Sequence, residues 1–225
     1  MTNEDVRPIA GNGSHQTTRL DLSGANLMFT NLRYTNLVEI NLSGASLSNA
    51  DLSHTNLSQA NLSDANLHQA NLTSVDLSEA NLLGTNLNQA ELSQANLSAA
   101  DLAGADLSQA NLHNANLSQA NLIGTNLKEA VLQEAYLGEA ILSGADLSQT
   151  DLSQADLREA SLNWANLQGA DLSEAQLQGT DLGWADLRGA NLDGVDLSNV
   201  RCNHQTQWPE DFCAEAHDLI LQDLC

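Results

Sequence analysis

The chain has 225 residues with a formal net charge of −22 at pH 7, and aromatic residues make up only 3% of it. This charge argues against nucleic acid or an anionic membrane surface as a direct partner. So few aromatic residues argue against an ordinary globular core, and no stretch is long and apolar enough to span a bilayer.

Residues 1–19 carry no repeat, and they begin with MTNED, which lacks the basic and apolar parts of a secretory signal. We therefore expect a cytoplasmic protein. The units that follow carry the bulky outward residues Met28, Phe29, Tyr34 and Val38. We expect part of the N-terminal segment to pack there and to cover the open end of the fold, because an uncovered β-edge invites aggregation. The alternative is that these four are isolated surface residues.

From residue 21 to residue 200 the sequence repeats every five residues. A leucine falls at every fifth position from Leu22 to Leu197 without a gap. The residue two before each leucine is nearly always small, most often Ala, and the residue just before it is usually Asp or Asn. A period of five fits neither a helix nor a strand. Each unit instead predicts a short extended segment, with the leucine and the small residue inward, followed by a corner.

Glycines show how many units close one coil. They recur in a single phase of a twenty-residue period, at Gly24, Gly44, Gly84, Gly104, Gly124 and Gly144, and Trp164 and Trp184 then take the same phase. Twenty residues are four units, so we predict a four-sided coil in which these residues stack in one column. The repeat is long enough for about nine coils.

The unit A-(D/N)-L-x-x resembles that of the pentapeptide repeat family, in particular its cyanobacterial members. The resemblance covers residues 21–200 and implies an all-β solenoid, a right-handed quadrilateral β-helix over residues 20–202. It also implies that the leucine and the small residue point inward and that the other three positions point outward. The family implies a fold more firmly than an activity.

After residue 200 the repeat stops, although Cys202 takes the next leucine position. Pro209, Glu210 and Asp211 are residue types that open a helix. Within the C-terminal region, 203–225, we therefore predict an α-helical cap from about residue 209 to 224 over the last coil, with Trp208 beside it. Its apolar stripe is Phe212, Ala216, Leu219, Ile220 and Leu224.

The sequence predicts no catalytic, cofactor-binding or metal site. His54, His68 and His113 are isolated and fall in different phases of the coil, whereas a metal needs several converging ligands. Within the repeat, every Ser, Asp and Glu is explained as a repeat position, so we expect a protein that is not an enzyme and has no cofactor. Three cysteines do not form a disulfide framework, which fits a reducing compartment.

The outward residues, sorted by their place in the coil, give faces of unequal character. The face with the glycine column carries what we call the apolar strip: Leu83, Ile123, Ile141, Trp164 and Trp184. Two other faces hold most of the acids, and there we single out an acidic group: Asp151, Asp156, Glu159, Asp171 and Glu174. A partner protein or a second copy would use an apolar strip. The alternative is that these apolar residues have no function and occur by chance at surface positions that tolerate many residue types.

Two classes of function follow. The first is an intracellular protein-interaction or regulatory scaffold, with a protein partner or a homodimer formed through the flat face or the ends. The resemblance supports it, because cyanobacterial members include a regulator of heterocyst differentiation. The alternative is an acidic DNA mimic that binds DNA gyrase or another DNA-binding protein, as members of the quinolone-resistance class do. That class commonly places Phe at central positions, whereas every centre here is Leu.

Overall fold

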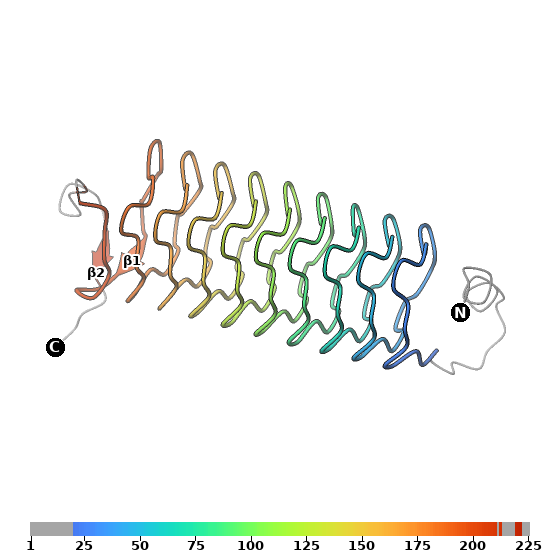
Figure 1. Cartoon of the computed structure of the whole chain (residues 1–225). Coiled ribbons are helices and arrows are strands. Elements are labelled where there is room, and N and C mark those ends of the chain that lie inside the picture. Colours follow the sequence, from blue (N-terminus) through green and yellow to red (C-terminus); the bar gives the residue numbers. More distant parts are fainter. Residues whose placement is uncertain (1–19, 211, 213–218, 222–225) are drawn as a thin grey trace.

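The structure, a computed structural model, describes residues 20–210, 212 and 219–221. These residues wind into a stack of similar coils along one axis, with the first described coil (blue) and the last (red) at opposite ends of the stack (Figure 1). Among the described residues, no helix is long and apolar enough to cross a membrane. The expected packing of residues 1–19 lies outside the described part of the chain.

Neighbouring coils are joined by parallel backbone bridges between residues twenty positions apart. The first coil has four of them, which begin at Asp21, Asn26, Asn31 and Asn36. Each bridge is made by the residue just before a leucine, so every side of the coil is one five-residue unit. The four-sided coil predicted from the glycine phase is therefore present.

Each side ends in a tight turn with an unusual backbone. In the first unit the Ala25 N–H donates to the carbonyl of Leu22 (3.1 Å), and Gly24 between them has a φ of 64°. A four-residue turn whose third residue alone has positive φ is of type II. Glycine adopts this conformation freely, whereas other residues lose about 1–2 kcal/mol each. Asn, Gln, Glu and even Trp nevertheless hold it at many of the other corners.

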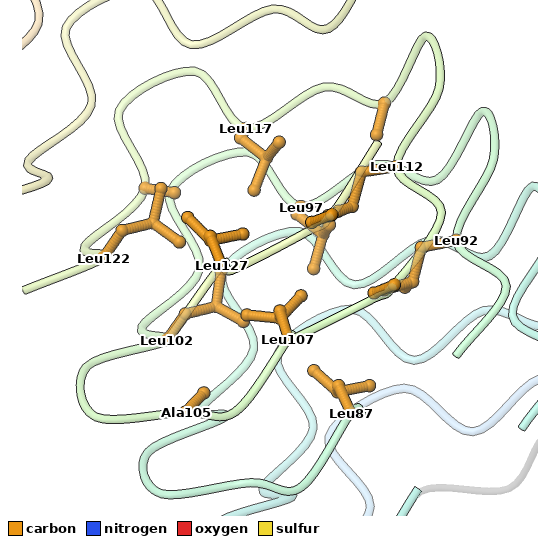
Figure 2. Close-up of a cluster of buried hydrophobic side chains, with 14 of the residues drawn as sticks. Leu87, Leu92, Leu97, Leu102, Ala105, Leu107, Leu112, Leu117, Leu122 and Leu127 are labelled. Atoms are coloured by element: carbon orange, nitrogen blue, oxygen red, sulfur yellow. The ribbon is translucent and has the colours of Figure 1, made fainter. Parts of the chain in front are cut away.

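The interior of the stack is filled by leucine and the small residue of each unit. Leu107, Leu112, Leu117 and Leu122 come from the four sides of one coil, and their side chains point into its interior (Figure 2). All four are 0% exposed. Burying a leucine contributes roughly 2 kcal/mol, and this gain recurs in every unit from Leu22 to Leu197 except at the partly buried Leu192.

Threonine replaces alanine at some inward positions without leaving its hydroxyl unpaired. Thr85 is fully buried, and its Oγ1 donates to the carbonyl of Leu62 in the preceding coil (2.8 Å). Thr125 and Thr180 make the same bond to Leu102 and Leu157. A buried hydroxyl without a partner would be costly, so this bond explains why Thr is tolerated there.

The C-terminal part of the stack ends in a strand pair. β1 (Arg201–Cys202) pairs in parallel with β2 (Ile220–Leu221), and the Ile220 N–H donates to the carbonyl of Val200 (2.8 Å). The prediction that residues 220 and 221 belong to a helical cap is wrong. Residues 209, 210, 212 and 219 are not helical either, and the rest of the predicted helix lies outside the described residues. The physical reason is the open edge of the last coil, whose backbone groups need partners.

One residue is inserted just before this end. Asp186 pairs with Gln207, whereas every earlier bridge joins residues twenty apart. Pairing thus continues past residue 202, where the sequence suggested that the β-helix would end. Trp208, which follows, packs against the leucine core and stacks on Phe212 with ring centroids 4.5 Å apart.

Two side chains compensate for the extra residue. The backbone N–H of Trp184 donates to Oδ1 of Asn203 (3.1 Å). In other coils a backbone carbonyl of the next coil accepts this hydrogen bond. Thr206 Oγ1 donates to the carbonyl of Leu182 (2.9 Å), the same bond that inward threonines make elsewhere. The corner therefore keeps its hydrogen bonds although the repeat is broken.

Replacing Leu112 by Asp tests the core. The change would bury a charge with no partner, so we expect loss of the β-rich circular dichroism spectrum or a much lower melting temperature. Gln109→Asp is the matched control, because Gln109 is exposed and Asp64 already occupies the equivalent corner with a φ of 56°. Equal melts for Leu112→Asp and wild type would contradict the inward placement of the leucines.

Candidate functional site

The stacked pair Trp164 and Trp184 dominates the apolar strip. Both occupy the positive-φ corner position, with φ values of 63° and 57°, on the same side of neighbouring coils. Their ring centroids are 4.7 Å apart and the planes differ by 5°. The two residues are 62% and 41% exposed. The prediction that the two tryptophans stack in one column and stay partly exposed is confirmed.

The other members of the apolar strip lie on the same face but in two different columns. Leu83 and Ile123 both follow an inward leucine, and the Ala103 coil separates them. Ile141 instead takes the position before the leucine, where its backbone bridges Asn121 and Ser161. All three are exposed. The structure therefore brings the two tryptophans into contact and spaces the aliphatic residues along the coils before them.

Two of the aspartates in the acidic group are tied into the fold. Asp151 and Asp171 lie in neighbouring coils, and each Oδ1 accepts the N–H of the serine two residues later (3.0 Å in both cases). Asp171 Oδ1 also accepts a hydrogen bond from Nδ2 of Asn191 in the next coil (3.1 Å). The backbone N–H of Ser173 is the main reason why the pKa of Asp171 lies below its usual value.

Asp156 differs because an arginine neutralises it. Arg158 Nε and Nη2 donate to the two carboxylate oxygens of Asp156, at 2.8 and 2.6 Å. This hydrogen-bonded ion pair lowers the pKa of Asp156 and raises that of Arg158. Asp186 and Arg188 form the same pair at 2.9 and 2.6 Å, which lowers the pKa of Asp186. A count of acidic residues in the sequence treats Asp156 and Asp186 as unpaired charges, whereas each is paired with an arginine.

Glu159 and Glu174 are the members of the acidic group that project into solvent. Both hold the positive-φ corner position, with a φ of 58°, and both are exposed. The side chain of Glu159 lies over Gly179 of the next coil, where an added Cβ would clash with its carboxylate. The acidic group thus combines structural aspartates with only two freely presented carboxylates.

Several exposed aromatic and aliphatic residues lie outside the predicted sites. Phe29 and Tyr34 are exposed in the first coil, and Tyr34 stacks on His54 with centroids 4.9 Å apart. Val131 and Tyr136 are exposed on the faces that carry most of the acids. The sequence could have indicated Val131 and Tyr136, because both replace the usual Asp or Asn before a leucine. Within the described residues, no group of three or more His, Cys, Asp or Glu converges as a metal site would require.

Four-sided coils of five-residue units with type II corners define a repeat solenoid. The chain matches the description "Pentapeptide repeats" in eight copies, over residues 21–59, 55–94, 90–129, 130–169 and 165–201. It belongs to the pentapeptide repeat family, whose members fold as right-handed quadrilateral β-helices.

Solved structures of this family are similar to the chain. HetL, a protein involved in heterocyst differentiation regulation from the cyanobacterium Nostoc sp. strain PCC 7120, shares 34% identity over 81% of this chain and 89% of HetL (TM-score 0.38). QnrB1, a plasmid-mediated fluoroquinolone resistance protein, shares 20% over 83% and 92% (TM-score 0.47). A protein of the Arabidopsis thaliana thylakoid lumen shares 25% over 52% and 65% (TM-score 0.21). No curated protein matches.

The Asp156–Arg158 pair predicts a pH-dependent contribution to stability. A carboxylate whose pKa is lowered in the folded state stabilises the fold above its unfolded pKa, about 3.9, and loses this contribution as the pH falls through the folded value. Asp156→Asn keeps the acceptor for the Arg158 N–H but removes the charge. We therefore expect a slightly lower melting temperature than wild type at pH 7 and a smaller difference near pH 2.

The control is Asp151→Asn, which removes a charge at the same repeat position from a carboxylate that accepts its bonds from Ser153. Its melting temperature should stay close to that of wild type at neutral pH, because Asn supplies the same acceptor at other corners. A deficit of Asp156→Asn that persists unchanged at pH 2 would contradict a role for the ion pair.

Proposed function

We propose that the chain is a non-enzymatic interaction or regulatory scaffold that acts inside the cell and binds a protein partner, or a second copy, through the apolar strip. The observation that carries this proposal is the solvent-exposed stack of Trp164 and Trp184. Large aromatic side chains that are exposed on one face are enriched at interaction sites.

The backbone supports a scaffold role because it presents the strip rigidly. Every unit is hydrogen-bonded to the coil before and after it, so the outward columns are held at the spacing of the coils. A partner that binds such a surface loses little entropy in ordering it. The stack of about nine coils would therefore act as a stiff platform.

A regulatory role is also supported by relationship. HetL, at 34% identity over most of both chains, is described as involved in the regulation of heterocyst differentiation. We propose a role of the same general kind here, in which the chain acts by binding a protein and not by chemistry. The process and the partner would be specific to this chain, because the outward residues differ from unit to unit.

The double variant Trp164→Ser/Trp184→Ser tests this proposal. Serine already holds this corner at Ser74 with a φ of 55°, so the fold should survive with a small change in melting temperature. We expect capture of the native partner, or self-association measured by light scattering, to fall at least about ten-fold, because aromatic hot spots are worth about 2 kcal/mol or more. Tyr34→Ser is the control, an exposed aromatic residue away from the strip. Equal binding by the double variant would remove this face from consideration.

An acidic DNA mimic is the second candidate, and the net charge of −22 is the observation that favours it. The arrangement of the acids weakens it, because Asp151 and Asp171 serve the corners and Asp156 is paired with Arg158. We therefore rank it below the scaffold.

Adding the protein to a gyrase supercoiling reaction separates the two candidates. We expect no inhibition at stoichiometric concentration, at low or physiological salt. A mimic would inhibit strongly at low salt and weakly at higher salt, as DNA binding itself does. The control neutralises the acidic group, with Asn at the three aspartates and Gln at Glu159 and Glu174. Inhibition by wild type that vanishes in this variant would make DNA mimicry the preferred function.

A further inference from the structure

Flat side chains at the positive-φ corner stack when they occupy neighbouring coils. Trp164 and Trp184 do so with an angle of 5° between their planes, and Tyr34 and His54 do so on another face with an angle of 1°. All four have φ values between 56° and 63°. The repeating backbone therefore sets both the orientation and the spacing of the rings, whatever their chemistry.

The tryptophan column is open on one side. One coil before Trp164 the same corner is Gly144, and a Cβ built there would meet no atom within 4 Å. Trp184 covers one face of the Trp164 indole, so the other face looks onto the bare corner of Gly144. The exposed fractions agree with this arrangement, since Trp164 is 62% exposed and Trp184 is 41% exposed.

We propose that this open face of Trp164 binds an arginine side chain of a partner protein, whose guanidinium takes the place in the column that Gly144 leaves empty. The inference rests on the proposed function and names the chemistry of its partner. A planar group fits because the column stacks planar groups at the coil spacing. A cation fits because the chain carries a net charge of −22 and the face of an indole attracts cations.

The surroundings of Gly144 suit the rest of an arginine side chain. Ile123 and Ile141 are exposed on the same face, in the coils that contain Gly124 and Gly144, and give the methylene stem an apolar surface. Asp146, two residues after Gly144, opens the next side of the coil and adds a carboxylate there, whose Oδ1 also accepts hydrogen bonds from the Ser148 N–H and from Nδ2 of Asn166. The chain itself shows the pairing, because the guanidinium of Arg33 lies 5.2 Å from the centroid of the Tyr34 ring. Lysine would bring the charge without the plane.

The test uses the peptide acetyl-Val-Arg-Val-amide and the full chain labelled with ¹⁵N. The indole N–H signals of the three tryptophans are followed during titration, and substitution of each in turn assigns them. We expect the Trp164 signal to shift most and the Trp208 signal not to move. Replacing the arginine by citrulline, which is planar but uncharged, should weaken binding about two- to five-fold, the range expected for an exposed cation–π contact. Lysine, which is charged but not planar, should also bind more weakly than arginine.

A pair of variants checks the position. Gly144→Gln fills the empty corner with a residue that holds it at Gln149 with a φ of 58°, and should abolish the shift at Trp164. Gly104→Gln, two coils earlier in the same column, should leave it unchanged. Binding of the citrulline peptide as strong as that of the arginine peptide, or a shift that survives Gly144→Gln, would overturn the inference.

Failure of this inference is distinguishable from failure of the scaffold proposal. Loss of partner capture in Trp164→Ser/Trp184→Ser, with no effect of the arginine peptide on Trp164, would keep the apolar strip as the binding surface and reject arginine as its ligand. Unchanged capture in that variant would reject both.

Discussion

The parallel pairing of each residue with the one twenty positions later is the constraint on which the rest of the structure depends. It places each unit directly over the unit four positions earlier in the chain. A leucine therefore always lies next to a leucine of the neighbouring coil, and an outward residue next to an outward residue. Within the described residues every bridge joins adjacent coils, so a unit is stabilised by the other sides of its own coil and by the coils before and after it. The surface is consequently a set of columns, and its chemistry is decided by which residue types follow one another at twenty-residue intervals.

Those columns explain why the same residue types serve both fold and surface. Asp and Asn before the leucine accept the N–H two residues later, and Asn also donates to the residue below it, as Asn41 does to Asp21 and Asn61 does to Asn41. The acids thus partly stabilise the corners, and Arg158 and Arg188 each cancel one charge, in two different columns. The fold does not require the side chains of Trp164 and Trp184, since Gly occupies the same corner in most earlier coils. That contrast separates the apolar strip from the acidic group as a candidate for recognition.

The sequence predicted the period, the four-sided coil, the inward leucines and the stacked tryptophans, because all four follow from spacing alone. It did not predict the positive φ of the corners, since Gln and Glu at the same position hide the glycine signal. Nor did spacing foresee the Asp156–Arg158 pair, which needs side-chain geometry. The predicted helix after Pro209 rested on local preferences, and β2 shows that the hydrogen-bonding demand of the open edge at Val200 prevails at residues 220 and 221. The inserted residue before Gln207 was equally invisible, because the repeat had already lost its leucine there.

The coil of four equal sides has a consequence for how such a chain can change by insertion or deletion. Removing twenty residues from the repeat would delete one coil and leave every later face in line with the earlier ones. Removing five between residues 141 and 164 would keep all leucines inside, yet it would turn everything that follows by one side and carry Trp164 and Trp184 away from Ile123 and Ile141. Length changes that are equally harmless to the core therefore differ in whether they preserve or dismantle a surface that spans several coils.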